Sequence, residues 1–267
     1  MTRLGDRFQQ LQSRNERALV CYVMAGDPSL DKTVEIVHAL DDAGVDAIEL
    51  GVPFSDPLAD GPSIQAASQR SLAAGMRVSD VFEVVRRIRK RSEIPIVVMT
   101  YCNPAFRYGM ARFAADSAES GVDGVIQTDL TPEESGGWIE AARPAGLDTV
   151  FLLAPTSTEA RIEVVSRLST GFIYCVSRTG VTGARDAVPA DLKAFVYRIK
   201  AHSKTPVCVG FGVSRPDHVR QITEFADGVV VGSALVDIIG EHGETANLVD
   251  EVRNFAAGLK SATKPPR

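Results

Sequence analysis

The sequence predicts a single-domain α/β protein, folded as a parallel (β/α)8 TIM barrel with an extra N-terminal helix. Eight short apolar runs recur along the 267 residues, helical patterns separate them, and a glycine-containing junction precedes several of them. The runs lack the polar–apolar alternation of a half-exposed sheet, which favours parallel strands covered on both faces. An open doubly wound sheet is the alternative fold, but no G-x-G-x-x-G follows the first run.

The first expected element is a helix over residues 2–14, which lies before the first strand and is placed to plug the bottom of the barrel. No linker, low-complexity segment or second domain is visible after it. We therefore expect one domain over residues 1–267, with a frayed tail over 261–267.

The eight expected strands share an apolar, largely β-branched composition. They are Ala18–Ala25, Ala47–Gly51, Ile94–Tyr101, Gly124–Thr128, Asp148–Leu153, Gly171–Val176, Pro206–Gly210 and Gly228–Gly232. Apolar residues at i, i+3 and i+4 predict helices between them, for example over Thr33–Ala43 and Val78–Arg91. Asp31 and Ser79 are the expected N-caps of these two helices.

A short junction recurs before four of the strands. It reads AGVD at 43–46, SGVD at 120–123, AGLD at 145–148 and, in shorter form, ADG at 226–228. Glycine just after a helix adopts the left-handed conformation that ends it, and the chain then turns into a buried strand. This repetition of helix, glycine and strand is typical of a barrel.

Composition excludes several classes of function. The formal net charge is −5, which argues against a protein that binds the nucleic-acid backbone. No apolar run is long enough to span a membrane, and the polar N-terminus does not read as a secretory signal. The four cysteines have no C-x-x-C spacing, so we expect neither a disulfide framework nor a zinc site, and a reducing cytoplasm as the location.

In a barrel of this kind the active site lies at the C-terminal ends of the strands. Glycines follow the last two expected strands, as Gly212 and as Gly232 beside Ser233. Glycine lets backbone N–H groups approach an anion closely, and these two loops commonly hold phosphate in such barrels. A third glycine-rich stretch, 177–185, follows the sixth strand and is placed to close as a lid, with Gly183 near the phosphate.

The second strand carries an acidic residue in an apolar context. Glu49 shares one face of that strand with Ala47 and Gly51. A carboxyl group buried on the inner face has a raised pKa, which suits proton transfer near neutral pH. Asp56 and Asp60 lie in the long loop that follows, which is placed to overhang the barrel mouth.

The residue types absent from the strand ends are also informative. No lysine stands at the C-terminal end of an expected strand, which argues against a Schiff-base aldolase. No histidine stands there either, so we expect no metal and no cofactor. Such a site moves protons, and it breaks a carbon–carbon bond only if the substrate supplies its own electron sink.

These motifs resemble the tryptophan synthase alpha subunit family. The resemblance rests on ELGVPFSDPLADGP around the second strand, AGDP after the first, YCNP after the third, SRTGVTG after the sixth and GFGVS after the seventh. It covers about residues 5–258, and the second-strand motif is long and specific.

The resemblance implies retro-aldol cleavage of indole-3-glycerol phosphate, with the indole ring as electron sink. It implies Glu49 as the acid–base group, Asp60 as the carboxylate that stabilises the ring N–H, and Tyr174 near the glycerol moiety. It further implies two sets of substrate contacts. They are Gly183, Gly212, Gly232 and Ser233 for the phosphate, and Tyr22, Ile64, Thr182 and Phe211 for the indole pocket.

The resemblance also implies a partner, the pyridoxal-phosphate-dependent tryptophan synthase beta subunit in an alpha2beta2 heterotetramer. Asp56, Pro57, Asn103 and Asp129 are the expected partner-facing residues. Three alternatives stay open. A stand-alone indole-3-glycerol-phosphate lyase shares every catalytic residue, a phosphosugar isomerase uses a similar carboxylate pair, and a non-catalytic phosphate-binding barrel activates a partner allosterically.

Overall fold

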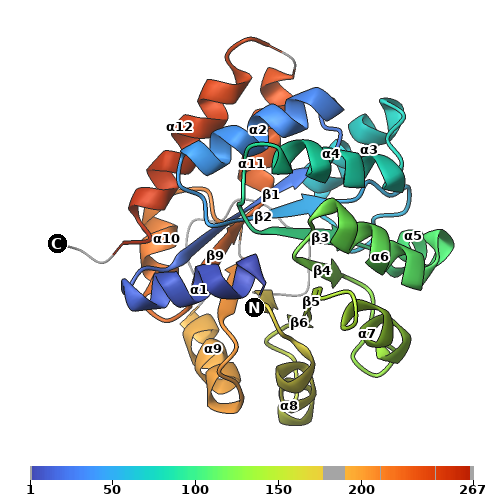
Figure 1. Ribbon diagram of the computed structural model, residues 1–267. Coiled ribbons are helices and arrows are strands. Elements are labelled where there is room, and N and C mark those ends of the chain that lie inside the picture. Colours follow the sequence, from blue (N-terminus) through green and yellow to red (C-terminus); the bar gives the residue numbers. More distant parts are fainter. Residues whose placement is uncertain (1, 177–189, 211, 244, 265–267) are drawn as a thin grey trace.

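The strands form one parallel sheet. The computed structural model describes residues 2–176, 190–210, 212–243 and 245–264 (Figure 1). In this part of the chain the strand order is β5-β4-β3-β2-β1-β9-β8-β7-β6. The strands are β1 Ala18–Met24, β2 Ala47–Gly51, β3 Ile96–Thr100, β4 Gly124–Gln127, β5 Asp148–Val150, β6 Leu152–Leu153, β7 Ile173–Val176, β8 Val207–Gly210 and β9 Gly228–Val231.

The strands at the two ends of this order, β5 and β6, follow each other directly in the chain. The fifth expected strand is divided at Phe151 into β5, which pairs with β4, and β6, which pairs with β7. Every pairing around the ring is parallel. The predicted parallel barrel is therefore confirmed, with the fifth strand interrupted rather than continuous.

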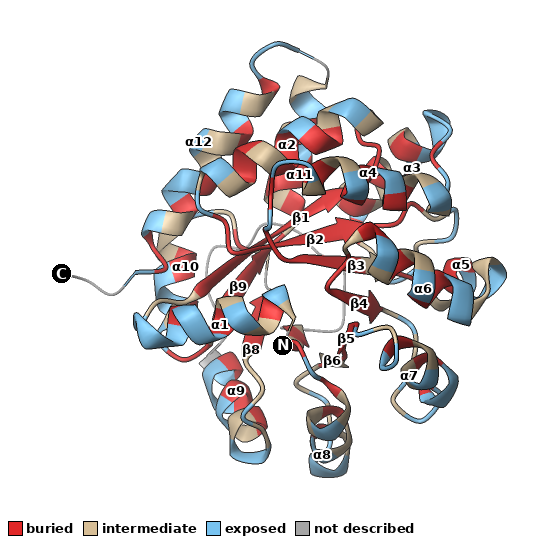
Figure 2. Cartoon of the chain, viewed as in Figure 1, coloured by how far each residue is buried: buried red, intermediate tan, exposed pale blue. Residues whose placement is uncertain are grey.

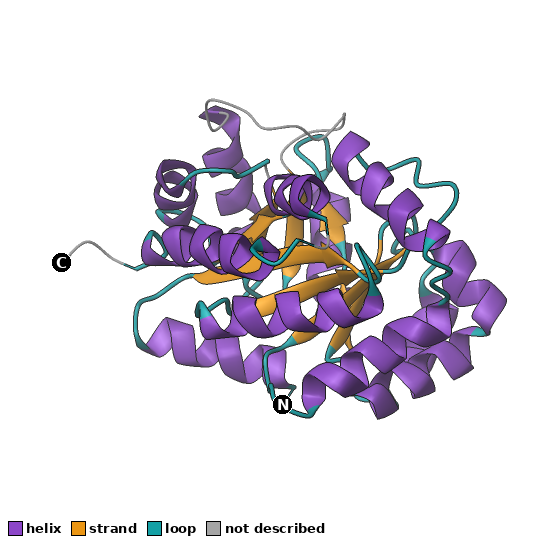
Figure 3. Cartoon of the chain, turned by 90° about the horizontal axis from the view of Figure 1, so that it is seen from above, coloured by secondary structure: helices purple, strands orange, loops and turns teal. Residues whose placement is uncertain are grey.

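Helices surround the strands, as the view from above shows (Figure 3). Those in the described residues are α1 Arg3–Ser13, α2 Leu30–Asp42, α3 Pro62–Ala73, α4 Val78–Arg89, α5 Cys102–Tyr108, α6 Met110–Ser120, α7 Gly136–Ala142, α8 Glu159–Leu168, α9 Ala190–His202, α10 Pro216–Thr223, α11 Ser233–His242 and α12 Leu248–Ser261. Their buried sides face the strands and their exposed sides face solvent (Figure 2).

Successive residues of each strand point to opposite faces of the sheet. In β2, Ile48 and Leu50 join the large apolar layer between strands and helices. Ala47 instead joins the smaller cluster inside the barrel, together with Val20 and Val97. This alternation places the side chain of Glu49 on the inner face, as the sequence predicted.

Helix α1 closes one end of the barrel. Its buried side chains Leu4, Phe8 and Leu11 belong to the inner cluster. The rings of Phe8 and Phe172 lie 6.1 Å apart, centroid to centroid. Because α1 meets the ends at which the strands begin, the other end is left for the site, and the expected plug is confirmed.

Three of the four repeated junctions behave as predicted, whereas Gly228 of the shorter junction is the first residue of β9 and has no left-handed φ angle. Gly44, Gly121 and Gly146 have φ angles of +84°, +98° and +75°, the left-handed region that glycine tolerates. The aspartate of the first junction, Asp46, accepts a hydrogen bond of 2.8 Å from Leu19 N at the start of the neighbouring strand. Asp123 accepts one of the same length from Ile96 N. These aspartates therefore fasten the lower ends of adjacent strands together.

Both expected N-caps are wrong. Ser29 caps α2, since its side chain accepts from Lys32 N, and Asp31 lies inside the first turn. Helix α4 begins at Val78, so Ser79 is its second residue, and the Asp80 carboxylate accepts from Arg77 N.

The tail is ordered further than expected. Helix α12 continues to Ser261, and Thr263 is 2% exposed. Arg17 N donates to Thr263 O at 3.2 Å, which ties this segment to the start of β1. Residues 261–264 thus pack against the barrel, residues 265–267 lie outside the described residues, and the frayed tail stays a prediction.

No helix in the described ranges has the length and apolar character needed to cross a bilayer.

Candidate active site

Glu49 is buried, and no described residue pairs with its carboxyl group. Its side chain lies inside the barrel on β2 and the residue is 1% exposed. Among the described residues, neither of its carboxyl oxygens has a hydrogen-bond partner. Burial, assisted by the negative charge of Asp60, raises the pKa of Glu49 to about 8. The group therefore holds its proton at neutral pH and is able to donate it.

Asp60 lies in the loop between β2 and α3. Burial raises the pKa of its carboxyl to about 6, and a hydrogen bond with the Tyr101 hydroxyl opposes that rise. The loop is held from two sides, because Ala59 N donates to Tyr101 Oη at 2.9 Å and Gln65 Nε2 donates to Asp60 O at 2.8 Å. The carboxyl is therefore ionised near neutral pH, whereas that of Glu49 is not.

Tyr101 is a site residue that our sequence analysis did not assign. It follows β3, is 6% exposed, and its ring lies 5.2 Å from that of Phe54, centroid to centroid. Its hydroxyl meets the loop that carries Asp60. The available signal was an aromatic residue with a polar tip at the C-terminal end of an expected strand.

Two tyrosines flank Glu49 on the inner face. Tyr22 is the register partner of Glu49 across β1 and β2. Its hydroxyl lies over Gly51, where an added Cβ would come within 2.1 Å of it. Tyr174 on β7 reaches over Gly210 in the same way, at 2.6 Å. Glycine at these two strand ends makes room for the phenols, a role that the sequence analysis did not recognise.

An apolar wall adjoins the tyrosines. Tyr22 and Ile64 belong to one buried cluster with Met24, Ala67 and Val236, which come from β1, α3 and α11. Two of the predicted pocket residues, Tyr22 and Ile64, are thus brought together. The other two, Thr182 and Phe211, lie outside the described residues.

One of the predicted phosphate glycines, Gly232, stands beside this wall. Gly232 precedes the first turn of α11, and no described side chain caps that turn, an arrangement that suits an anion at its backbone N–H groups. A Cβ on Gly232 would lie 3.7 Å from Tyr22 Cβ and 4.0 Å from Ile64 Cδ1. Gly212 has φ +63°, a conformation that other residues adopt with strain. Gly183 lies outside the described residues.

The expected partner-facing residues lie at the same end of the barrel, in the segments that follow β2, β3 and β4. Asp56, Asn103 and Asp129 are exposed and Pro57 is half-buried. Asp129 Oδ1 accepts from Cys102 N at 2.6 Å, at the start of α5. Contact with a partner stays a prediction.

Two exposed apolar residues stand among them, and our sequence analysis missed both. Leu58 is 91% exposed and Phe106 is 70% exposed. They were missed because a single apolar residue in a loop or a short helix carries no periodic signal.

Within the described residues, no group of three or more His, Cys, Asp or Glu side chains is arranged to hold a metal ion.

Fold and site together define a (β/α)8-barrel protein that carries two carboxyl groups of raised pKa at the C-terminal ends of its strands. The chain belongs to the tryptophan synthase alpha chain family, because that family's model matches residues 8–264. The resemblance seen in its motifs is thereby confirmed.

Individual relatives agree. The tryptophan synthase alpha chain of Solibacter usitatus is 48% identical over 260 residues, which is 97% of each chain. Among solved structures, tryptophan synthase from Mycobacterium tuberculosis superposes with a TM-score of 0.92 at 39% identity, over 99% of both chains. The alpha subunit from Legionella pneumophila gives a TM-score of 0.91 at 36% identity, over 98% of both.

Proposed function

We propose that this chain cleaves indole-3-glycerol phosphate to indole and glyceraldehyde 3-phosphate. One observation carries the proposal. It is the carboxyl of Glu49, buried inside the barrel mouth and left without a partner among the described residues. A protein does not keep such a group for stability, because burying an unpaired polar group costs free energy. Membership of the tryptophan synthase alpha chain family supports the choice of substrate.

In the proposed reaction Glu49 moves one proton in each direction. Its neutral carboxyl protonates C3 of the indole ring, which converts the ring to an indoleninium cation. The resulting carboxylate then accepts the proton of the hydroxyl group on the adjacent side-chain carbon. That oxygen becomes a carbonyl, the carbon–carbon bond breaks, and its electron pair returns to the ring. Indole and the aldehyde leave, and Glu49 ends in its starting state.

Asp60 has the complementary role. The ring nitrogen gains positive charge when C3 is protonated, and an ionised carboxylate at the ring N–H stabilises that charge. The different pKa values of Glu49 and Asp60 support this division, since the more buried group carries the proton and the other stays charged.

The remaining predicted residues are assigned to substrate binding. We assign the phosphate to the turn at Gly232 and Ser233, with Gly212 and Gly183. Tyr174 is placed for the glycerol moiety. Tyr22, Ile64, Thr182 and Phe211 are assigned to the indole ring.

For the partner we propose a pyridoxal-phosphate-dependent beta subunit in an alpha2beta2 assembly, working in tryptophan biosynthesis. Exposed Leu58 and Phe106, beside the residues predicted to face it, support a partner surface at the barrel mouth. A pull-down with cleavage measured with and without the beta subunit separates this reading from a stand-alone lyase. The cytoplasmic location stays a prediction.

The deciding experiment replaces Glu49 with glutamine. Glu49→Gln keeps the shape of the side chain but removes its acidic proton. We therefore expect cleavage to fall at least ~1,000-fold while inorganic phosphate still binds. Glu83→Gln on the outer surface of α4 is the control, and it keeps full activity. Normal turnover by Glu49→Gln would exclude the proton-transfer role. Loss of cleavage in Glu83→Gln would also count against it, because the effect would then not be specific to Glu49.

A further inference from the structure

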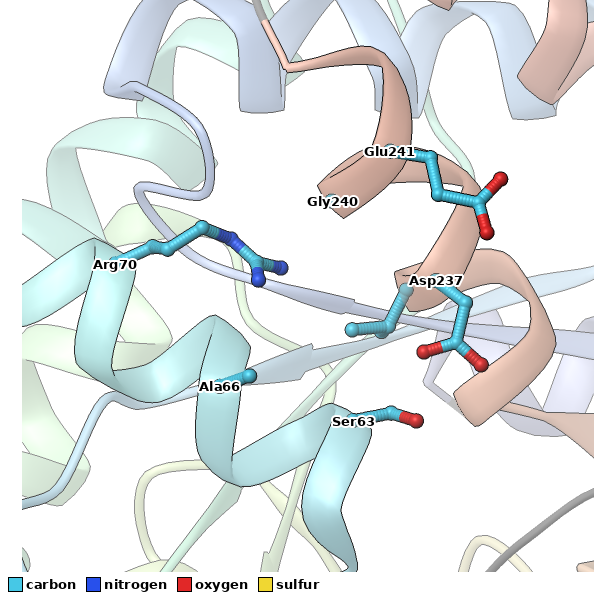
Figure 4. Close-up of a pocket in the computed structure, with 7 residues that line it drawn as sticks. Ser63, Ala66, Arg70, Asp237, Gly240 and Glu241 are labelled. Atoms are coloured by element: carbon cyan, nitrogen blue, oxygen red, sulfur yellow. The ribbon is translucent and has the colours of Figure 1, made fainter.

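A polar junction on the outside of the barrel joins three segments that lead to the site. A cavity of about 240 Å³ lies between α3 and α11. Arg70 reaches into it from α3, and Gly240, Asp237 and Glu241 line it from α11 (Figure 4). None of these residues belongs to the acid–base site or to the phosphate turn.

Arg70 is held by a buried carboxylate. Its Nε and Nη2 atoms each donate to a different oxygen of Asp27, both at 2.7 Å. Asp27 is 2% exposed and lies in the loop that follows β1. Two parallel hydrogen bonds from a planar guanidinium to a carboxylate fix both distance and orientation. The pair therefore locks α3 to that loop in one arrangement.

The same guanidinium lies directly against α11. A Cβ added to Gly240 would come within 3.1 Å of both Nη atoms and 3.2 Å of Cζ of Arg70. The hydrogen bonds to Asp27, followed by the charges of Asp27 and Asp237, raise the pKa of Arg70, against the opposing effect of burial. Arg70 thus packs on the backbone of one helix while it is tied to the loop beside it.

Each segment at this junction continues to a part of the site. Helix α3 leads back to Gln65, which holds the backbone of Asp60. Helix α11 begins at Ser233, next to Gly232. The loop after β1 is tied to α3 a second time, because Ser71 Oγ donates to Ala25 O at 2.5 Å. The junction therefore links the elements that carry the second carboxylate and the phosphate turn.

We propose that Arg70 is a positioning residue, which holds α11 at a fixed place relative to α3 and so aligns the phosphate turn with the two carboxylates. This inference rests on the function proposed above. The alignment matters because a substrate anchored at its phosphate reaches the acid–base group only if the anchor is correctly placed. An error of about 1 Å in such a distance costs up to about 100-fold in rate.

The test is Arg70→Lys. Lysine keeps a positive charge beside the buried carboxylate of Asp27, so this carboxylate still has a cationic partner. A single ammonium group does not reproduce the two parallel hydrogen bonds or the flat contact with Gly240. We expect kcat for indole-3-glycerol phosphate to fall about 10-fold, with KM changed less than about 3-fold. Binding of inorganic phosphate, measured by calorimetry, should stay within about 2-fold, because the phosphate turn itself is intact.

A second variant approaches the same contact from α11. Gly240→Ala pushes the guanidinium by a few tenths of an ångström without removing any charge, and we expect a loss in kcat of about 3-fold. Gly258→Ala is the matched control, since Gly258 is also in a helix and an added Cβ there meets nothing within 4 Å. Arg91→Lys is the control for the arginine, because Arg91 pairs with Asp42 at 2.7 Å on the exposed surface.

The outcomes are distinct. Loss of kcat in both junction variants with phosphate binding retained, and in neither control, supports the inference. Unchanged kcat in a folded Arg70→Lys, or a parallel loss of phosphate affinity, overturns it. Should Arg70→Lys fail to fold, Gly240→Ala decides alone, and wild-type kcat in that variant overturns the inference. If the wild-type chain does not cleave the substrate, the proposed function has failed, and the inference falls with it.

Discussion

Buried aspartates at the lower end of this barrel and the buried Glu49 inside its upper end have opposite surroundings. At the lower end, Asp123 is 3% exposed and fully engaged. It accepts from Ile96 N at 2.8 Å, from Arg89 at 2.9 Å and from Arg3 at 3.1 Å. Burial raises the pKa of Asp123, but these hydrogen bonds and the two guanidinium charges oppose the rise.

Other aspartates at the lower end follow the same pattern. Asp46 accepts from Leu19 N and pairs with Lys260. Asp227 accepts from Val207 N at 2.9 Å and pairs with Lys200 at 2.8 Å. Each carboxylate connects one strand to the next and meets a cation from a helix.

At the upper end, Glu49 is as deeply buried, and the described part of the chain offers it neither a backbone donor nor a cation. Its nearest charged influence is another carboxylate, Asp60, which raises the pKa further. A carboxylate that is paired stays ionised and stabilises the fold, whereas one that is buried and unpaired exchanges its proton near neutral pH. Burial alone therefore does not set the charge state of a carboxyl group in this barrel, because the groups around it decide whether it is ionised.

The largest expected effect comes from removing an aspartate at the lower end. Asp123→Ala leaves Arg89 and Ile96 N without their shared acceptor in a buried place, and we expect a loss of about 3–5 kcal/mol in the free energy of unfolding. Activity per folded molecule should be unchanged. Urea unfolding and turnover of the same samples measure both quantities.

Asp42→Ala is the matched control for this loss. Asp42 pairs with Arg91 in the open, with side chains 45% and 58% exposed, so we expect less than about 1 kcal/mol. An equal loss in both variants would show that the lower aspartates are no more than surface charges.

The next prediction concerns the carboxyl group of Glu49. Replacing this group should raise the free energy of unfolding rather than lower it. Since the pKa of Glu49 is about 8 in the folded chain and 4.5 is its ordinary value, the folded state binds the extra proton between these pH values. Stability from this group is therefore full below pH 4.5 and falls as pH rises towards 8. Glu49→Gln removes that dependence, and relative to wild type it should gain about 3 kcal/mol between pH 5 and pH 8.

Thermal or urea unfolding of Glu49→Gln and wild type across this range tests the claim. Comparing the two proteins cancels the titrating groups that do not interact with Glu49. Parallel stability curves would mean that Glu49 is ionised and paired in solution, contrary to the structure.

The smallest expected effect sharpens the picture of the upper end. Gly232→Val adds methyl groups beside Tyr22 and Ile64, where a Cβ alone makes ordinary contacts. The fold should therefore survive, while inorganic phosphate binds about 10-fold more weakly because the turn of α11 is obstructed. Calorimetric titration measures this, with Gly137→Val in open space as control. Unchanged phosphate affinity would show that phosphate does not bind at this turn.

The sequence predicted those features of the structure that depend on neighbouring residues in the chain. Alternation along β2 places Glu49 inside the barrel, and glycine before aspartate marks the junctions at 44 and 121. It was weaker at element ends, because Asp31 and Ser29 are both good cap residues and only the path of the backbone selects Ser29. The interruption at Phe151 likewise has no local signature.

Contacts between distant residues lay beyond local patterns. Tyr101 meets the loop of Asp60 from a different strand, and Arg70 meets Asp27 from 43 residues away. Aromatic and charged residues with no periodic neighbours give no indication of which partner they will reach. Tertiary folding selects the partner.

Local sequence patterns specify which residues form buried strands and on which face an acidic side chain stands, because side-chain direction follows from a period of two along the backbone. Which carboxylates are paired depends on the folded arrangement of the chain. At the lower end, strand starts and helix cations surround Asp46 and Asp123, and at the upper end none of the described residues supplies Glu49 with a partner. The charge state of a buried group depends on what lies within a few ångströms of it, and that environment is assembled from segments far apart in the chain.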